Sequence, residues 1–114
     1  MARSQRPFCP VMEFQRMISG KYKLRILWDL REGPLRFGTL RNGLLRGALG
    51  TDEISRRVLS RELKALAEMG MLRRKDFQVM PRKVEYSLTS KGKSLIPIIS
   101  KMHDWGARHL APPR

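Results

Sequence analysis

Apolar residues recur at every third or fourth position along the first part of the chain, which predicts amphipathic helices. The first helix opens at Pro10, because the missing N–H costs nothing at the first helical position, and it ends at Gly20. The second runs over about 21–31 and is broken by Gly33-Pro34. The apolar faces of the two helices comprise Val11, Phe14, Ile18, Leu24, Leu27 and Trp28.

A segment with a weaker pattern separates these helices from the clearest one. Residues 35–37 are a candidate for a very short strand, and a third helix begins near Gly38. The stretch 43–53 contains three glycines, which favour a loop. A long helix then follows Ser55, a good N-cap residue, and its apolar stripe consists of Leu59, Leu63, Leu66 and Met69.

After Gly70 the apolar period changes from that of a helix to that of a strand. Residues 71–77 and 83–88 read as two strands, with Met80-Pro81 at the turn between them. A last helix follows, capped by Thr89 or Ser90. The order predicts a mainly α fold with a small β hairpin, a winged helix-turn-helix that ends in a C-terminal helix.

The same pattern predicts how the chain is divided. Residues 1–8 are expected to be a flexible basic arm, and residues 9–110 a single winged helix-turn-helix domain. Within it the wing covers about 72–88 and the terminal helix about 90–109.

Charge is the unusual feature of the composition. The 114 residues include 24 Lys and Arg against 10 Asp and Glu, a net charge of +14. Such an excess points to a polyanionic partner, either nucleic acid or an anionic membrane surface. No apolar run is long enough to span a bilayer, no signal peptide is evident, and a single cysteine permits no intrachain disulfide. These features predict a cytoplasmic protein.

The long helix carries a basic face opposite its apolar stripe. Arginine near the start of a helix in the major groove can pair with O6 and N7 of guanine, and serine offers a donor and acceptor. The alternative is a solvated basic face. The order of elements favours DNA contact, and the expected contacts are Ser55, Arg56, Arg57, Ser60, Arg61 and Lys64.

Further cations lie on the hairpin. Arg82 and Lys83 follow its turn, where they are expected to reach the DNA backbone or minor groove. Arg73, Arg74 and Lys75 lie on its first strand, and the pattern does not separate a DNA contact from charge that protects an exposed edge.

The terminal helix has a wide apolar stripe at helical spacing. The stripe fits an intrachain core, and it also fits a dimer interface, where Trp and Met are enriched. We expect a mixture of the two. The residues predicted to hold the dimer are Leu95, Ile98, Ile99, Met102 and Trp105.

Cys9 is the only thiol and the predicted N-cap of the first helix. The helix N-terminus and the preceding Arg3 and Arg6 would favour the thiolate, which suits an oxidant sensor. An inert thiol that packs as a small apolar group is the other interpretation. The two histidines and one cysteine have no zinc-site spacing, and no phosphate loop or nucleophile–base pattern stands out. We therefore expect no enzyme, no metal and no cofactor.

The sequence resembles the HxlR-type winged helix-turn-helix regulators of bacteria and archaea over nearly its whole length, from Cys9 to Trp105. It departs from the family by Tyr22, where Trp is common, by Glu53, where Gly is common, and by a longer stretch before Ser55. The residues that carry the resemblance are Cys9-Pro10-Val11, Gly20-Lys21-Tyr22, Leu24 to Leu30, Arg36-Phe37, Ile54 to Leu59, Leu63 to Leu66, Val84 to Thr89, Gly92, Leu95, Pro97 and Trp105.

The resemblance implies a DNA-binding dimer held largely by its terminal helices, and some members of the family sense oxidants through a cysteine near the N-terminus. Lys21 joins the expected DNA contacts. The leading hypothesis is a sequence-specific regulator that binds double-stranded DNA as a homodimer and responds to oxidants or electrophiles through Cys9. A structural RNA-binding protein is the alternative, although only eight aromatic residues (four Phe, two Trp, two Tyr) are available for base stacking. A membrane-surface protein is less favoured, because cations are sparse on the terminal helix.

Overall fold

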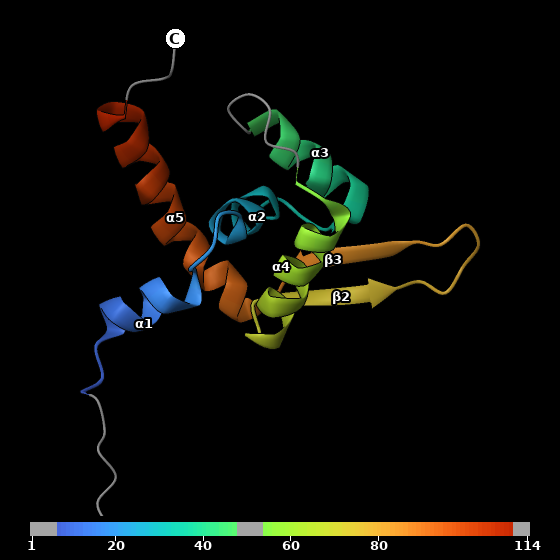
Figure 1. The fold of residues 1–114 in the computed structure, drawn as a ribbon, viewed down its shortest axis with the longest axis horizontal. Helices are drawn as coiled ribbons and strands as arrows, with labels where there is room; N and C mark the ends of the chain where they lie inside the picture. The colour runs from blue at the N-terminus through green and yellow to red at the C-terminus, as the bar shows by residue number, and fades with distance from the viewer. Residues whose placement is uncertain (1–6, 48–53, 111–114) are drawn as a thin grey trace, which may run out of the picture.

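The computed structural model describes residues 7–47 and 54–110. It confirms a mainly helical fold with a small antiparallel sheet, and Figure 1 shows its arrangement. The elements in chain order are α1 (Pro10–Met17), α2 (Lys23–Asp29), β1 (Leu35–Arg36), α3 (Phe37–Gly47), α4 (Arg56–Glu68), β2 (Leu72–Asp76), β3 (Val84–Leu88) and α5 (Ser90–His109).

The sheet has three strands in the order β1-β3-β2, all antiparallel. The hairpin pairs Leu72 with Leu88 at its base. The short strand predicted at 35–37 is present over two residues, and it adds to the outer edge of β3 by pairing Leu35 with Tyr86. The hairpin protrudes beyond the helices, as Figure 1 shows, and β1 pairs along only one of its edges, that of β3.

The stretch 43–53, in which three glycines favour a loop although Leu44 fits the third helix, is helical in its first part. Residues 43–47 continue α3, and 48–53 lie outside the described residues. Leu40 and Leu44, one turn apart, are both buried, and this packing outweighs the low helix propensity of glycine. At Gly43 a Cβ atom would lie 3.0 Å from Oδ2 of Asp29, so glycine allows α2 to approach closely.

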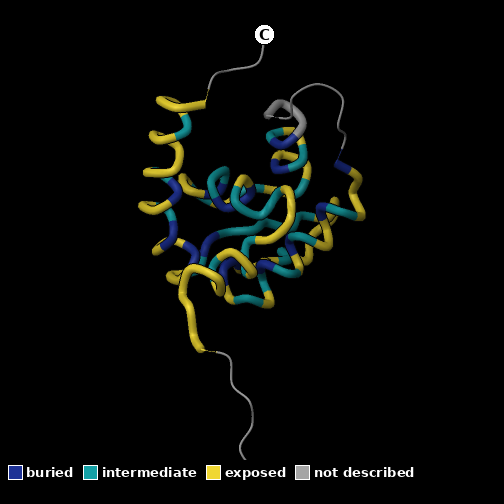
Figure 2. Tube along the Cα trace, turned by 60° about the vertical axis from the view of Figure 1, so that its left-hand side comes forward, coloured by how far each residue is buried: buried dark blue, intermediate teal, exposed yellow. Residues whose placement is uncertain are grey.

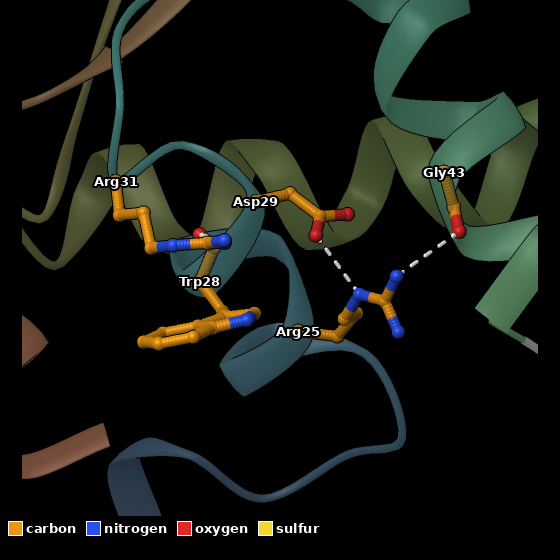
Figure 3. Close-up of polar contacts among 5 residues, drawn as sticks. All are labelled: Arg25, Trp28, Asp29, Arg31 and Gly43. Carbon is orange, nitrogen blue, oxygen red and sulfur yellow. Dashed lines mark hydrogen bonds and ion pairs between the residues drawn. The ribbon is translucent and has the colours of Figure 1, made fainter. Parts of the chain in front are cut away.

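Figure 3 shows how α2 is tied to α3. The Arg25 guanidinium donates to Asp29 Oδ1 at 2.9 Å and to the Gly43 carbonyl oxygen at 3.4 Å. Nearby, the Arg31 guanidinium lies 4.0 Å from the centre of the Trp28 ring. The Trp28 ring also stacks on His103 of α5, with ring centres 5.4 Å apart. These contacts hold α2 between α3 and α5.

The core consists of apolar residues from α2, α3, α4, the sheet and the first half of α5. Figure 2 shows it as buried segments on the inward sides of these elements. At Gly92 the helix α5 packs directly against the backbone just before β2, because a Cβ there would lie 2.3 Å from the Met71 carbonyl oxygen. The buried residues are Ile26, Leu27, Leu30, Leu40, Leu44, Ile54, Leu59, Leu63, Leu66, Met71, Leu72, Leu88, Leu95 and Ile99.

One ion pair within this framework fixes α4 against α2. The Lys23 ammonium donates to Glu62 Oε1, and both side chains are nearly buried, at 11% and 14% exposure. Lys23 also donates to the Ser19 carbonyl oxygen at 3.0 Å, in the turn between α1 and α2. Burial restricts both partners, so this pair sets the position of α4 more firmly than a surface pair would.

Candidate nucleic-acid interface

The helix α4 begins and packs as its sequence pattern predicts. The Ser55 hydroxyl accepts a hydrogen bond from the Val58 backbone N–H at 3.0 Å, which satisfies one of the free N–H groups of the first turn. Leu59, Leu63 and Leu66 are buried against the core. The helix is therefore held rigidly by one face.

The opposite side, here named the outer face of α4, is exposed. The single acidic residue between positions 56 and 64 is Glu62, and its carboxylate is turned inward to Lys23. Over positions 56–64 the outer face thus presents positive charge and one hydroxyl donor, with no competing carboxylate, which suits the major groove. Its residues are Arg56, Arg57, Ser60, Arg61 and Lys64, all exposed.

The wing, which comprises β2, β3 and the turn between them, holds the two cations predicted at its tip. Arg82 donates to Asp76 Oδ2 at 3.3 Å, and Asp76 Oδ1 accepts from the Gln78 backbone N–H at 2.9 Å. The Lys83 ammonium lies 4.3 Å from the centre of the Phe77 ring. Both cations remain at the surface but are oriented by contacts within the wing.

The register of the wing separates the three cations of β2. Side chains alternate across a strand, so Arg74 lies on the same face as Leu72 and its partner Tyr86, whereas Arg73 and Lys75 lie on the other face. The face of Arg74 borders α4 across a cleft of about 400 Å³. Its lining residues are Ser60, Leu63, Lys64, Ala67, Arg74 and Tyr86.

Arg74 and Tyr86 were not among the predicted contacts. The alternation of β2 is visible in the sequence, but its apolar members are too few to show which face meets α4. Lys21 is exposed in the turn before α2, with its ammonium 5.6 Å from the centre of the Tyr22 ring. It belongs to neither α4 nor the wing.

The predicted dimer residues of α5 divide between two environments. Leu95 and Ile99 are buried in the core of the same chain. Ile98, Met102 and Trp105 are exposed, at 53%, 43% and 54%. Figure 2 shows this outward side of α5 as largely exposed along its length. Further exposed apolar residues at the other end of the described chain are Phe8, Val11 and Met12.

Cys9 is the N-cap of α1, and its thiol is exposed and makes no capping hydrogen bond. It lies in a cleft of about 230 Å³ with Met12, Glu13 and Arg16. The Arg16 guanidinium donates to Glu13 Oε2 at 3.3 Å. The thiol is thus accessible and has a cation and a carboxylate beside it. The predicted influence of Arg3 and Arg6 concerns positions outside the described residues.

Two further features concern metal binding and membrane insertion. Within residues 7–47 and 54–110, no three His, Cys, Asp or Glu residues are grouped so that they could hold a metal ion. No helix in these ranges has the length and apolar character that crossing a membrane requires.

Comparison with known proteins agrees with this geometry. The model of the HxlR-like helix-turn-helix family matches residues 17–113. An uncharacterized HTH-type transcriptional regulator of Methanothermobacter thermautotrophicus is 36% identical over 98 residues, which are 86% of this chain and 70% of that protein.

Two solved structures are also similar. The oxidized form of the redox regulator HypR is 32% identical with a TM-score of 0.78, and the match covers 91% of this chain and 100% of that one. The reduced form of the transcriptional regulator YodB of Bacillus subtilis is 27% identical with a TM-score of 0.71, over 95% of this chain and 100% of that one. The chain therefore belongs to the HxlR-like helix-turn-helix family, and it is a transcription regulator of the helix-turn-helix type.

Proposed function

We propose that this regulator binds double-stranded DNA at specific sequences as a homodimer. The observation that carries the proposal is the outer face of α4, where Arg56, Arg57, Ser60, Arg61 and Lys64 are exposed on a helix held by its other side. Bidentate arginine contacts in the major groove can specify a sequence, while the cations of the wing position the protein on the backbone.

The exposed apolar side of α5 supports the homodimer. Ile98, Met102 and Trp105 follow one another at spacings of four and three residues, so these exposed apolar side chains lie on one side of α5 and are not scattered. A second copy of the chain is the occupant that the family implies, and symmetric pairing would place two α4 helices for a two-fold related site. Leu95 and Ile99, by contrast, stabilise the single chain.

The first experiment measures which nucleic acid binds. Genomic fragments that bind the purified protein are selected, and the bound duplex is then challenged with double-stranded RNA and with single-stranded RNA of the same sequence. The proposal predicts that the selected DNA duplex outcompetes both RNAs, and that it binds at least about 10³-fold more tightly than random duplex DNA at physiological salt. Preferential retention of either RNA would favour the structural RNA-binding alternative.

We also propose that modification of Cys9 changes the affinity for DNA. The thiol is exposed at the start of α1, and the redox regulator HypR is among the similar proteins. The test compares wild type and Cys9→Ser before and after treatment with diamide and a small thiol. A change confined to wild type supports sensing, and an unchanged wild type, or an equal change in both proteins, refutes it.

We propose in addition a domain organisation and a location for the chain. Residues 9–110 form one domain, and residues 1–8 precede it as a basic arm that lies mostly outside the described residues. A regulator of this kind acts where the chromosome is accessible, so we propose a cytoplasmic location. We also propose that the protein regulates by binding and has no enzymatic activity.

A further inference from the structure

We infer that the cleft between α4 and the wing is a binding site for one phosphodiester group of the DNA backbone. Lys64 of α4 and Arg74 of β2 would hold the phosphate from two sides, with the hydroxyl groups of Ser60 and Tyr86 as additional donors. This site deepens the proposed function and rests on it, since it names the chemical group that the space between the two DNA-binding elements receives.

The geometry of B-DNA supplies the first reason. A sugar–phosphate strand separates each major groove from the adjacent minor groove. A helix in the major groove and a hairpin directed at the minor groove must straddle that strand. The space between α4 and the wing is therefore where the backbone must pass, and there the structure has a cleft of about 400 Å³.

The chemistry of the lining supplies the second reason. Lys64 comes from α4 and Arg74 from β2, and no acidic residue lines the cleft among the residues that the structure describes. A guanidinium and an ammonium are the two cations with which proteins most often hold phosphate, and hydroxyl groups complete the donor set. Asp76, the acid on the same face of β2, is already engaged by Arg82 and by the Gln78 backbone N–H.

The availability of the two cations is the third reason. Among residues 7–47 and 54–110, neither Lys64 nor Arg74 has a hydrogen-bond or ion-pair partner. Arg82 and Lys83, the cations predicted first, contact Asp76 and Phe77 within the wing. The cations that remain available between α4 and the wing are therefore Lys64 and Arg74.

The register of the sheet provides a matched control. Arg73 is the immediate neighbour of Arg74, carries the same charge and is also exposed, but it lies on the opposite face of β2. Arg73→Ala and Arg74→Ala therefore change the net charge identically. A general electrostatic attraction predicts equal effects of the two substitutions, whereas a phosphate site predicts unequal ones.

The experiment measures affinity for a short mixed-sequence duplex over a range of salt concentrations. Arg74→Ala should weaken binding by about tenfold and lower the salt slope by about one unit per lost phosphate contact, and Arg73→Ala should have less than half of each effect. Tyr86→Phe, which keeps the ring, should weaken binding by a few fold. Circular dichroism of each variant checks that the fold is kept.

A second measurement identifies the group that is bound. Single phosphates of a selected duplex are replaced by neutral methylphosphonates. One position in each half-site should weaken wild type by about tenfold, and the same replacement should weaken Arg74→Ala much less, because only Lys64 and the hydroxyl groups still hold that phosphate. Equal effects of Arg73→Ala and Arg74→Ala, or a scan without such a position, would overturn the phosphate site. Failure of wild type to bind any duplex would overturn the proposed function itself.

Discussion

Gly92 occupies a place in α5 where no larger residue fits. A Cβ atom would lie 2.3 Å from the Met71 carbonyl oxygen and 3.1 Å from Leu88 Cδ2, so the helix would have to move away from the start of the wing. We expect Gly92→Ala to lower the free energy of unfolding by about 2–3 kcal/mol, as overpacking against backbone does. Urea denaturation at a fixed protein concentration measures this.

A control lies in the same helix. At Gly106 an added Cβ would meet, within the described part of the chain, only Leu110 Cδ1 at 3.6 Å, an ordinary contact. Gly106→Ala should therefore gain helix propensity and stabilise the protein by up to about 1 kcal/mol. Equal destabilisation by both substitutions would show that the close contact at Gly92 is not what makes glycine necessary there.

The arginines in the first turn of α4 are expected to determine which DNA sequence is preferred, each through its own base contact. Arg56→Ala or Arg57→Ala is expected to weaken specific binding by about 1–3 kcal/mol and to affect random DNA less, because base contacts are lost and not phosphate contacts. Titration of a selected duplex and of a random duplex at one salt concentration gives both values. If both affinities fell equally for both variants, these arginines would contact the backbone instead.

Among the elements, α4 depends on α2 through the pair of Lys23 and Glu62. Glu62→Gln leaves a nearly buried ammonium without its counterion, and we expect a loss of about 2–3 kcal/mol in the free energy of unfolding. The double variant Lys23→Met/Glu62→Met replaces both charges by apolar groups and should recover most of that loss. Chemical denaturation of the three proteins provides the comparison.

The exposed ion pair of Glu13 and Arg16 is the control for the nearly buried pair of Lys23 and Glu62. Its side chains are about half exposed, so Glu13→Gln should change stability by less than about 0.5 kcal/mol. An equally small effect of Glu62→Gln would mean that water reaches Lys23 and that apolar packing alone positions α4.

For the whole molecule, the outward side of α5 should control assembly. The double variant Met102→Glu/Trp105→Glu places two negative charges on the proposed interface, and we expect monomers at micromolar concentration and loss of a two-fold symmetric footprint. Val79→Glu at the tip of the wing, where the valine is 50% exposed, changes a similarly exposed apolar residue away from α5. Sedimentation equilibrium should show that this control remains a dimer, and persistence of dimers in the double variant would contradict the assignment.

The sequence by itself determined the elements whose pattern is local. The apolar stripe of α4, the cap at Ser55 and the change of period after Gly70 each lie within one or two turns of chain, and they place the basic face of α4 outward. The order of these elements then identifies the fold, because a helix with one apolar face and a hairpin with one buried side have few ways to share a core.

Only the tertiary structure decided which distant residues meet. Burial of Leu44 keeps residues 43–47 helical despite their glycines, and β1 adds to β3 across about fifty positions of sequence. Lys23 finds Glu62, and Arg74 faces α4 while Arg73 does not. The periodicity of the sequence shows which side of a helix or strand is apolar. Which other element packs against that side depends on complementary shape and charge, and these are set by the whole fold. That is why the sequence shows the basic face of α4, whereas the cleft beside it becomes visible only in the folded chain.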